Sequence, residues 1–263
     1  MKGTLPTLSV MTAIVLLGVG FGALALPAAE LYHTSSSLNW GGFVSYTSAG
    51  SPQPVISKVS ASWTQPSVQV SKSAKYSSFW LGVGGFTEGT LIQTGTSADT
   101  NNNQASYYAW YEMLPAGSIA INCLTIKVGD HISAYVEESS SNNWIIDITT
   151  DGAGGGSASC SGPGGAFHQT FSYASSKKSA EWIAERPSLC FVTCQLTKLA
   201  NFGTVTFTSA SYVASGVTYT ISGAGAGTSD SVLMVSNGGK ILCDVQPRSN
   251  PGSTFNAIWK ASG

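Results

Sequence analysis

Short runs of alternating apolar and polar residues follow one another along the chain from residue 39 onward. They are rich in Val, Ile, Thr, Tyr and Trp, and clusters of Gly, Ser and Asn separate them. A period of two, carried by residues of these types, is the pattern of a half-buried β-strand. The runs predict strands over residues 55–63, 78–83, 107–113, 131–136, 144–149, 205–208 and 217–221.

Many short strands separated by turn residues predict an all-β sandwich or barrel of antiparallel strands with little helix. The stretches 100–104, with its consecutive asparagines, and 151–165, rich in Gly and Ser, are expected to be exposed loops, not domain linkers. The one helical candidate is 189–199, whose Cys and Thr residues favour helix weakly. We therefore predict a single β domain over residues 39–263.

The N-terminal residues have a different pattern. Lys2 precedes an apolar run over residues 8–26, and Ala23 and Ala25 form an A-x-A cleavage pattern. The run also approaches the ~20 apolar residues that cross a bilayer, so an N-terminal anchor is the alternative. We expect a signal peptide over residues 1–25, a short segment over 26–38, and a secreted, extracellular protein that leaves the membrane once the leader is cleaved.

Charged residues make up only 10% of the chain, and the formal net charge is −1. The chain has no basic cluster, which argues against nucleic acid as a partner. Acid denatures proteins largely by protonating carboxylates that the native state keeps ionised, so a fold with few charges loses less stability at low pH. The composition is therefore compatible with work in acid.

The five cysteines fit an exported protein with up to two disulfides and one remaining thiol. Cys190 and Cys194 are close enough to close a small loop, and we favour a disulfide between them. A metal site at this spacing would need histidines as well. The rest of the connectivity stays open.

Familiar peptidase motifs are absent from the sequence: it has no H-E-x-x-H, no D-T-G or D-S-G and no G-x-S-x-G. The histidines lie in unrelated contexts, which gives a serine or cysteine triad little support. Two strand-like segments instead carry polar residues, GTLIQTGT over 89–96 and SAEWIAERP over 179–187. In the second, Glu181, Ile183 and Glu185 share one face of the strand, although two surface glutamates would give the same pattern.

Seven blocks in order resemble the glutamic peptidase (eqolisin) family and cover nearly the whole mature chain. They are NWGGFV at 39–44, FWLGVGG at 79–85, LIQTGT at 91–96, YYAWYEMLP at 107–115, VGDHI at 128–132, SAEWIAERP at 179–187 and FGTVTFTSA at 202–210.

The resemblance implies a sandwich of two curved antiparallel sheets, concanavalin-like or jelly-roll-like, with the catalytic pair on its concave face. By motif, that pair is Gln93 and Glu185. Trp40, Trp80, Trp110 and Glu112 would line the cleft and bind substrate, although the tryptophans could equally be sandwich core. The implied protein is an endopeptidase that acts on polypeptides. We expect no cofactor or metal, and a monomer, because nothing in the sequence suggests an obligate partner.

These residue types suit peptide hydrolysis in acid. An ionised Glu185 would take a proton from the attacking water and return it to the leaving amine. The Gln93 amide would donate to the oxyanion and stays neutral at any working pH. A histidine base, with a pKa near ~6.5, would be protonated where a carboxylate near ~4.3 is still partly ionised.

The chain departs from the fungal members, which carry aspartates at the positions of Gly84, Ser97 and Tyr108 and an acidic residue at the position of Arg186. In these respects it resembles prokaryotic relatives. The departures leave the pH optimum and the hydrogen-bond scheme around the pair open.

Two other functions fit part of the pattern. A glycoside hydrolase could use Glu112 and Glu185 as paired carboxylates on a concave sheet, although Gln93 in place of an acid argues against it. A non-catalytic carbohydrate-binding module could use the tryptophans alone, because fold does not settle function.

Overall fold

The computed structural model describes residues 32–46, 55–190, 194–222 and 228–263. The predicted leader over residues 1–25 lies outside them. The described residues form strands, one short 3-10 helix (Pro163–Gly165) and no α-helix, so none of their helices is long and apolar enough to cross a membrane.

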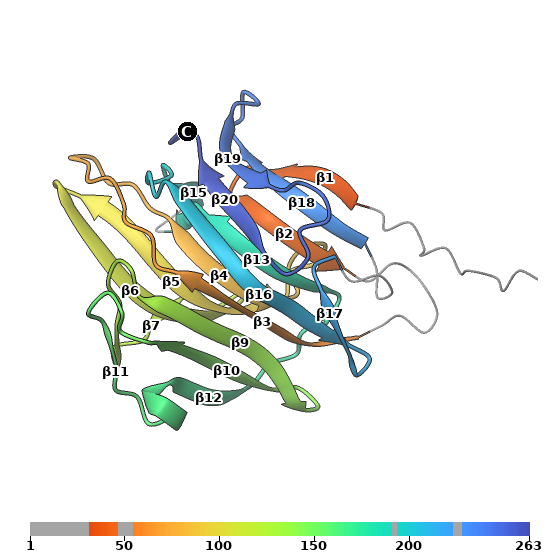
Figure 1. The fold of residues 1–263 in the computed structure, drawn as a ribbon. Helices are drawn as coiled ribbons and strands as arrows, with labels where there is room; N and C mark the ends of the chain where they lie inside the picture. The colour runs from red at the N-terminus through yellow and green to blue at the C-terminus, as the bar shows by residue number, and fades with distance from the viewer. Residues whose placement is uncertain (1–31, 47–54, 191–193, 223–227) are drawn as a thin grey trace, which may run out of the picture.

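One hydrogen-bonded sheet supplies both layers of the fold (Figure 1). The first layer, in spatial order, consists of β12 (Phe167–Ser172), β10 (Asn143–Thr150), β9 (His131–Ser140), β3 (Ile56–Thr64), β16 (Thr204–Ala214) with β17 (Val217–Thr220) paired to it, and β20 (Phe255–Trp259). After β19 (Ile241–Gln246), the second layer consists of β18 (Thr228–Val235), β2 (Trp40–Tyr46), β13 (Ser179–Glu185), β4 (Ser78–Val83), β5 (Ile92–Asn101), β6 (Gln104–Met113) and β7 (Ile119–Ala120). The remaining strands are β1 (Tyr32–Ser37), β8 (Leu124–Thr125) with β11 (Ser157–Ala158), and β14 (Ser188–Cys190) with β15 (Cys194–Leu196).

The main core fills the space between the two layers. Buried aromatic residues from both layers meet there, and Phe43 of β2 packs edge-on against Phe255 of β20 with ring centroids 5.0 Å apart. Indole N–H groups also cross the gap. Trp63 of β3 donates to Thr96 of β5 at 3.0 Å, and Trp182 of β13 donates to the Ser60 carbonyl of β3 at 3.0 Å. These bonds satisfy polar atoms that burial would otherwise penalise.

The predicted fold class is confirmed, with two additions. The layers are halves of one continuous sheet, because β19 joins them by hydrogen bonds at one edge. The segment expected over residues 26–38 includes β1, which pairs in parallel with β18 while the other pairings are antiparallel.

All seven predicted strands are present, within a few residues of their predicted ends or longer. The asparagine loop is a two-residue turn between β5 and β6, in which Asn102 and Asn103 have positive φ angles of 50° and 58°. Asparagine tolerates this conformation better than most residues, which explains the local sequence.

The helix predicted over 189–199 is wrong. The described residues there form an antiparallel hairpin of β14 and β15, because pairing between the two segments, and not local propensity, determines their state. Cys190 and Cys194 are register partners in it, and Cys194 is disulfide-bonded, which agrees with the predicted pairing. The side chain of Cys190 lies outside the described residues, so its place as the partner stays a prediction. Cys123 and Cys160 are joined by a disulfide, and Cys243 is a buried thiol.

Glu181 is a buried acid at the centre of the second layer. Its side chain is 0% exposed, and neither carboxyl oxygen has a hydrogen-bond partner among the described residues. Burial, assisted by the charge of Glu88, raises its pKa well above the ordinary value. The fold therefore holds Glu181 as a neutral acid, because an ionised carboxylate without partners is costly to bury.

We expect the free energy of unfolding to fall as the pH rises above the pKa of an ordinary glutamate. Between the pKa of unfolded Glu, near ~4.3, and the raised folded pKa, the native state binds more protons than the unfolded chain. One such group lowers the free energy of unfolding by up to ~1.4 kcal/mol per pH unit. Glu181→Gln should remove the contribution of Glu181 and leave the smaller slope that other buried carboxyls such as Glu185 produce, which urea unfolding at pH 4, 5, 6 and 7 would measure. A variant whose stability depends on pH as steeply as the wild type would contradict the assignment.

Candidate active site

Successive side chains of β13 point to opposite faces of the sheet, and the two faces have different surroundings. Trp182 and Ala184 point into the core between the layers, whereas Ile183 belongs to a second apolar cluster on the opposite face with Trp80 and Trp110. Because side chains two residues apart share a face, Glu181 and Glu185 lie on the side of Ile183. The face expected from the sequence is therefore present, and it is the outer face of the second layer.

Register across β13, β4, β5 and β6 places polar residues in two rows on this face. One row contains Glu181, Gly82, Gln93 and Glu112, and the next but one contains Glu185, Ser78, Ser97 and Tyr108. The row between them holds Trp80, Gly95 and Trp110. Gln93 and Glu185, distant in sequence, thus face the same side across a strip of tryptophans.

Gly95 makes room for this strip. A Cβ atom at this position would lie 2.2 Å from the Phe79 carbonyl oxygen and 2.6 Å from the Cβ of Trp80. Real side chains do not approach that closely, so Gly95 leaves the room that β4 and the Trp80 side chain need at this position.

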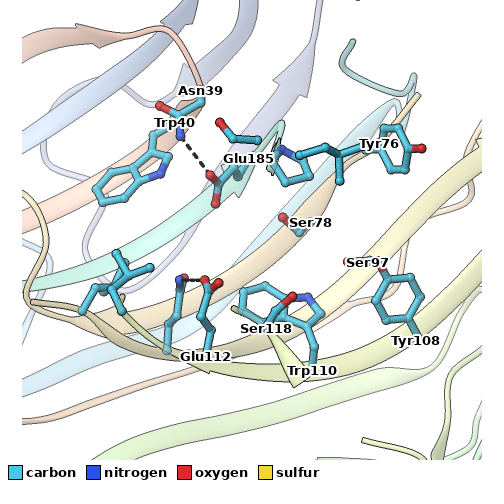
Figure 2. Close-up of a pocket in the computed structure, with 16 residues that line it drawn as sticks. Asn39, Trp40, Tyr76, Ser78, Ser97, Tyr108, Trp110, Glu112, Ser118 and Glu185 are labelled. Atoms are coloured by element: carbon cyan, nitrogen blue, oxygen red, sulfur yellow. Dashed lines mark hydrogen bonds between the residues drawn. The ribbon is translucent and has the colours of Figure 1, made fainter. Parts of the chain in front are cut away.

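A pocket of about 410 Å³ opens over these rows (Figure 2). Its lining residues are Asn39, Trp40, Tyr76, Ser78, Leu91, Gln93, Ser97, Tyr108, Trp110, Glu112, Leu114, Ser118, Glu185, Pro187, Ser188 and Leu189. Glu185 and Glu112 lie on opposite sides of the pocket in Figure 2, with Tyr76 and Tyr108 at one end. No lysine or arginine is among the lining residues, which are aromatic, aliphatic, hydroxyl-bearing, amide and acidic.

Both carboxyl oxygens of Glu185 have donors. The Asn39 amide donates to Oε1 at 2.9 Å, and the Trp80 indole N–H donates to Oε2 at 2.8 Å. Burial still dominates and raises the pKa of Glu185 to about 7, against the opposing effect of these bonds. The charge of Glu112 raises it further. Glu185 is therefore a fixed carboxyl whose proton is exchanged near neutral pH.

Gln93 is held from the other side of the pocket. Its Nε2 donates to Oε2 of Glu112 at 2.6 Å, and its side chain is 3% exposed. Burial raises the pKa of Glu112, and the bond from Gln93 lowers it. Nε2 carries a second N–H bond, and Oε1 of Gln93 is buried without a partner among the described residues. The amide thus has hydrogen-bonding capacity left for a ligand.

The structure separates the expected lining residues into two groups. Trp40, Trp110 and Glu112 border the pocket. Trp80 does not, because its side chain is 0% exposed and packs edge-on against Trp40 with centroids 5.1 Å apart. Its contact with the site is the bond to Glu185, so we assign it a positioning role instead of a contact with substrate.

Sequence reasoning missed three residues at this site. Asn39 begins the NWGGFV block but drew no attention beside Trp40, although its amide binds Glu185. Tyr76 lines the pocket from the segment before β4. Asp99 accepts a bond at 2.9 Å from Tyr108, which lines the pocket, and burial raises the pKa of Asp99 to about 6. Only the block motif could have indicated Asn39. Tyr76 depends on tertiary contacts, and Asp99 depends on a bond within the β5–β6 hairpin.

Among the described residues, no group of three His, Cys, Asp or Glu side chains could hold a metal ion. The polar groups gathered in the pocket are two carboxylates and two amides, with indole and hydroxyl groups around them.

Comparisons with known proteins find one family. A model of the Peptidase A4 family matches residues 38–256. Aspergillopepsin-2 from Aspergillus niger is 31% identical over 177 residues, which are 64% of this chain and 54% of that protein. The chain thus spans about half the length of this curated relative.

Solved structures share the fold. Scytalido-glutamic peptidase with a transition-state analogue inhibitor superposes with a TM-score of 0.67 at 23% identity, covering 86% of this chain and 100% of that one. Aspergilloglutamic peptidase from Aspergillus niger superposes with a TM-score of 0.54 at 27% identity, covering 71% of this chain and 99% of that one.

The indole of Trp80 should be required to hold the pKa of Glu185 down to about 7. Trp80→Phe removes the donor to Oε2, and losing a hydrogen bond to a charged group raises a carboxyl pKa by about one unit. A ¹³C NMR titration of the Glu185 carboxyl would measure this.

Trp110→Phe is the matched control, because the Trp110 indole N–H has no partner among the described residues. It removes similar aromatic volume from the same row and should leave the pKa of Glu185 unchanged. An equal shift in both variants would attribute the effect to packing and contradict the role of the Trp80 N–H.

Proposed function

Because the chain belongs to the Peptidase A4 family, we propose that it is a glutamic endopeptidase that cleaves polypeptides, with Glu185 as general base and Gln93 as the oxyanion donor. The observation that carries the proposal is the joining of these two side chains in one pocket, each fixed by its own partners. Fixed donors and bases are what hydrolysis of an unreactive amide requires.

Glu185 supplies the proton transfers. In its ionised form it takes a proton from a water molecule as the water oxygen attacks the peptide carbonyl, giving a tetrahedral intermediate and a neutral Glu185 acid. That acid then gives the proton to the leaving nitrogen, the C–N bond breaks, and the carboxylate is restored. Asn39 and Trp80 support this cycle because they restrain both oxygens of one side chain.

Gln93 stabilises the intermediate. One N–H bond of its Nε2 is held by Glu112, which fixes the amide, and the second can donate to the oxygen that becomes negative. A donor of this kind stabilises charge that develops only during the reaction, and so lowers the barrier. Glu112 acts as a positioning residue through Gln93.

The sequence argument assumed that the pKa of Glu185 is close to that of an ordinary glutamate, near ~4.3, whereas burial raises it to about 7. With a pKa of about 7, the ionised fraction falls about tenfold for each pH unit below neutrality. Activity should therefore rise with pH toward 7, while the buried acids make the fold less stable in the same direction. These opposing slopes give an optimum in weak acid.

The test is hydrolysis of an unfolded protein by the purified mature chain from pH 2 to 8, with pepstatin present to exclude aspartic peptidases. We expect cleavage with a weakly acidic optimum. Glu185→Gln should lower the rate at least ~100-fold, as loss of a general base does. Gln93→Ala should lower it ~100-fold or more, as loss of an oxyanion donor does. The control is Glu137→Gln, which removes a carboxylate that pairs with Lys58 away from the pocket.

Other outcomes would point to the rival functions. Equal cleavage by wild type and Glu185→Gln would contradict the role of Glu185. A glycoside hydrolase would cleave glycans, lose activity in Glu112→Gln and respond weakly to Gln93→Ala. A binding module would bind glycans and show no turnover at any pH.

We also propose that the protein is secreted. The leader pattern supports export, and the Cys123–Cys160 disulfide fits an oxidising compartment. N-terminal sequencing of material from the culture medium should find a chain that begins close to residue 26. Recovery of the uncleaved chain in the membrane fraction alone would contradict secretion.

A further inference from the structure

Arg186 follows the proposed base directly and is a buried cation. Its side chain belongs to a residue that is 7% exposed, and burial lowers its pKa. No carboxylate among the described residues forms an ion pair with it. A buried guanidinium needs acceptors for its fixed N–H groups, and here carbonyl oxygens provide them.

One acceptor lies in the chain that leads into the pocket. Nε of Arg186 donates to the Leu38 carbonyl at 2.7 Å, and the backbone N–H of Arg186 donates to the Asn39 carbonyl at 3.0 Å. Two consecutive carbonyls are thus fixed by one residue. The side-chain amide of Asn39 in turn donates to Oε1 of Glu185 at 2.9 Å. Arg186 is therefore connected to the Glu185 carboxyl through Asn39.

A further bond of Arg186 reaches the segment after β15. Nη1 of Arg186 donates to the Thr197 carbonyl at 3.4 Å, and Thr197 in turn donates through Oγ1 to the Pro187 carbonyl at 2.8 Å. Pro187 lines the pocket. The guanidinium therefore connects the segment before β2 with the segment after β15.

We propose that Arg186 is a positioning residue that fixes the Leu38–Asn39 backbone and thereby keeps the Asn39 amide on Glu185. The inference deepens the proposed function, on which it rests. It concerns a position where the resemblance to fungal glutamic peptidases fails, since those carry an acid there. An acidic side chain has no N–H groups for the Leu38 and Thr197 carbonyls, so this way of holding the base belongs to chains with arginine.

A rival explanation is simple electrostatics, because any cation beside Glu185 stabilises its ionised form. Arg186→Lys separates the two. Lysine keeps the charge but places a methylene carbon where arginine has Nε, so it cannot donate to the Leu38 carbonyl from that position. Arg186→Met removes both the charge and the donor. Positioning predicts that both variants behave alike, whereas electrostatics predicts that Arg186→Lys resembles the wild type.

The experiment is a double-mutant cycle between Arg186 and Asn39, read from the pKa of Glu185 by ¹³C NMR and from kcat and KM across pH. Arg186→Lys and Arg186→Met should each raise the pKa of Glu185 by about one unit, because the Asn39 hydrogen bond is weakened. The acid limb of kcat/KM should move by the same amount. We expect kcat to fall about tenfold while KM changes less than about twofold, because the base and not substrate binding is displaced.

The cycle itself gives the sharpest outcome. In the Asn39→Ala background, Arg186→Met should produce no further shift in the pKa of Glu185, because the route through Asn39 is already lost. An equal shift in both backgrounds, or a wild-type titration in Arg186→Lys, would overturn the proposal. Arg248→Met, which removes an arginine paired with Asp244, is the control and should leave the titration unchanged.

Failure of this inference can be told from failure of the proposed function. If the wild type cleaves no peptide, the proposed function fails, while the NMR titration still tests the effect of Arg186 on Glu185. If the wild type is active and no Arg186 variant moves the pKa of Glu185, only the inference fails. Thermal unfolding identifies variants that are not folded, and Arg186→Lys carries the test if Arg186→Met is one of them.

Discussion

The site depends on one conflict, which is the burial of a carboxyl group against aromatic rings. Removing Glu185 from water disfavours its charged form and raises its pKa to about 7, whereas the donors Asn39 and Trp80 favour that form. If burial acted alone, the group would be a neutral acid throughout the acidic range. If the donors acted alone, it would be a weak base. The balance gives a carboxyl that exchanges its proton near neutrality, which is a useful property for a group that must both take and return one.

The same pleat that forms the core also forms the site. On β13 and β5 one set of alternate side chains seals the space between the layers, and the other set faces the pocket. A shift of one residue in register would exchange these sets and destroy both. Core packing therefore fixes the positions of Gln93 and Glu185 relative to each other, although neither contacts the main core. Residues such as Trp182 act on the site through register alone.

Features of the fold and the site that depend on local contacts could be predicted from the sequence, and those that depend on remote contacts could not. The strands and the asparagine turn were predicted because their period and turn residues lie within short segments. The hairpin at 188–196 was mistaken for a helix because its pairing partner, and not local periodicity, determines its state. Gln93 and Glu185 were identified through resemblance, since period alone could not distinguish them from surface residues. Asn39 and the contacts of Arg186 required the fold, because their partners are remote in sequence. Asp99 and Tyr108 belong to one hairpin, but periodicity alone does not single out a bond between them.

The sparse charge of the chain gains a more specific meaning from the structure. Hydroxyl pairs such as Ser60–Ser211 and Ser62–Ser133 link neighbouring strands on the face away from the core, and these bonds do not titrate in acid. Hydrogen bonds lower the pKa values of Asp151 and Asp244, so these residues stabilise the fold when ionised and lose that effect when acid protonates them. Glu181 and Glu185 have the opposite effect, because burial favours their neutral forms and acid supplies the proton. Tolerance of acid therefore has two sources: few bonds that protonation breaks, and buried carboxyls that protonation relieves. The buried carboxyls Glu181 and Glu185 both lie on β13, the strand that carries the proposed base. The stability of the fold and the chemistry of the pocket therefore respond to pH through the same few side chains.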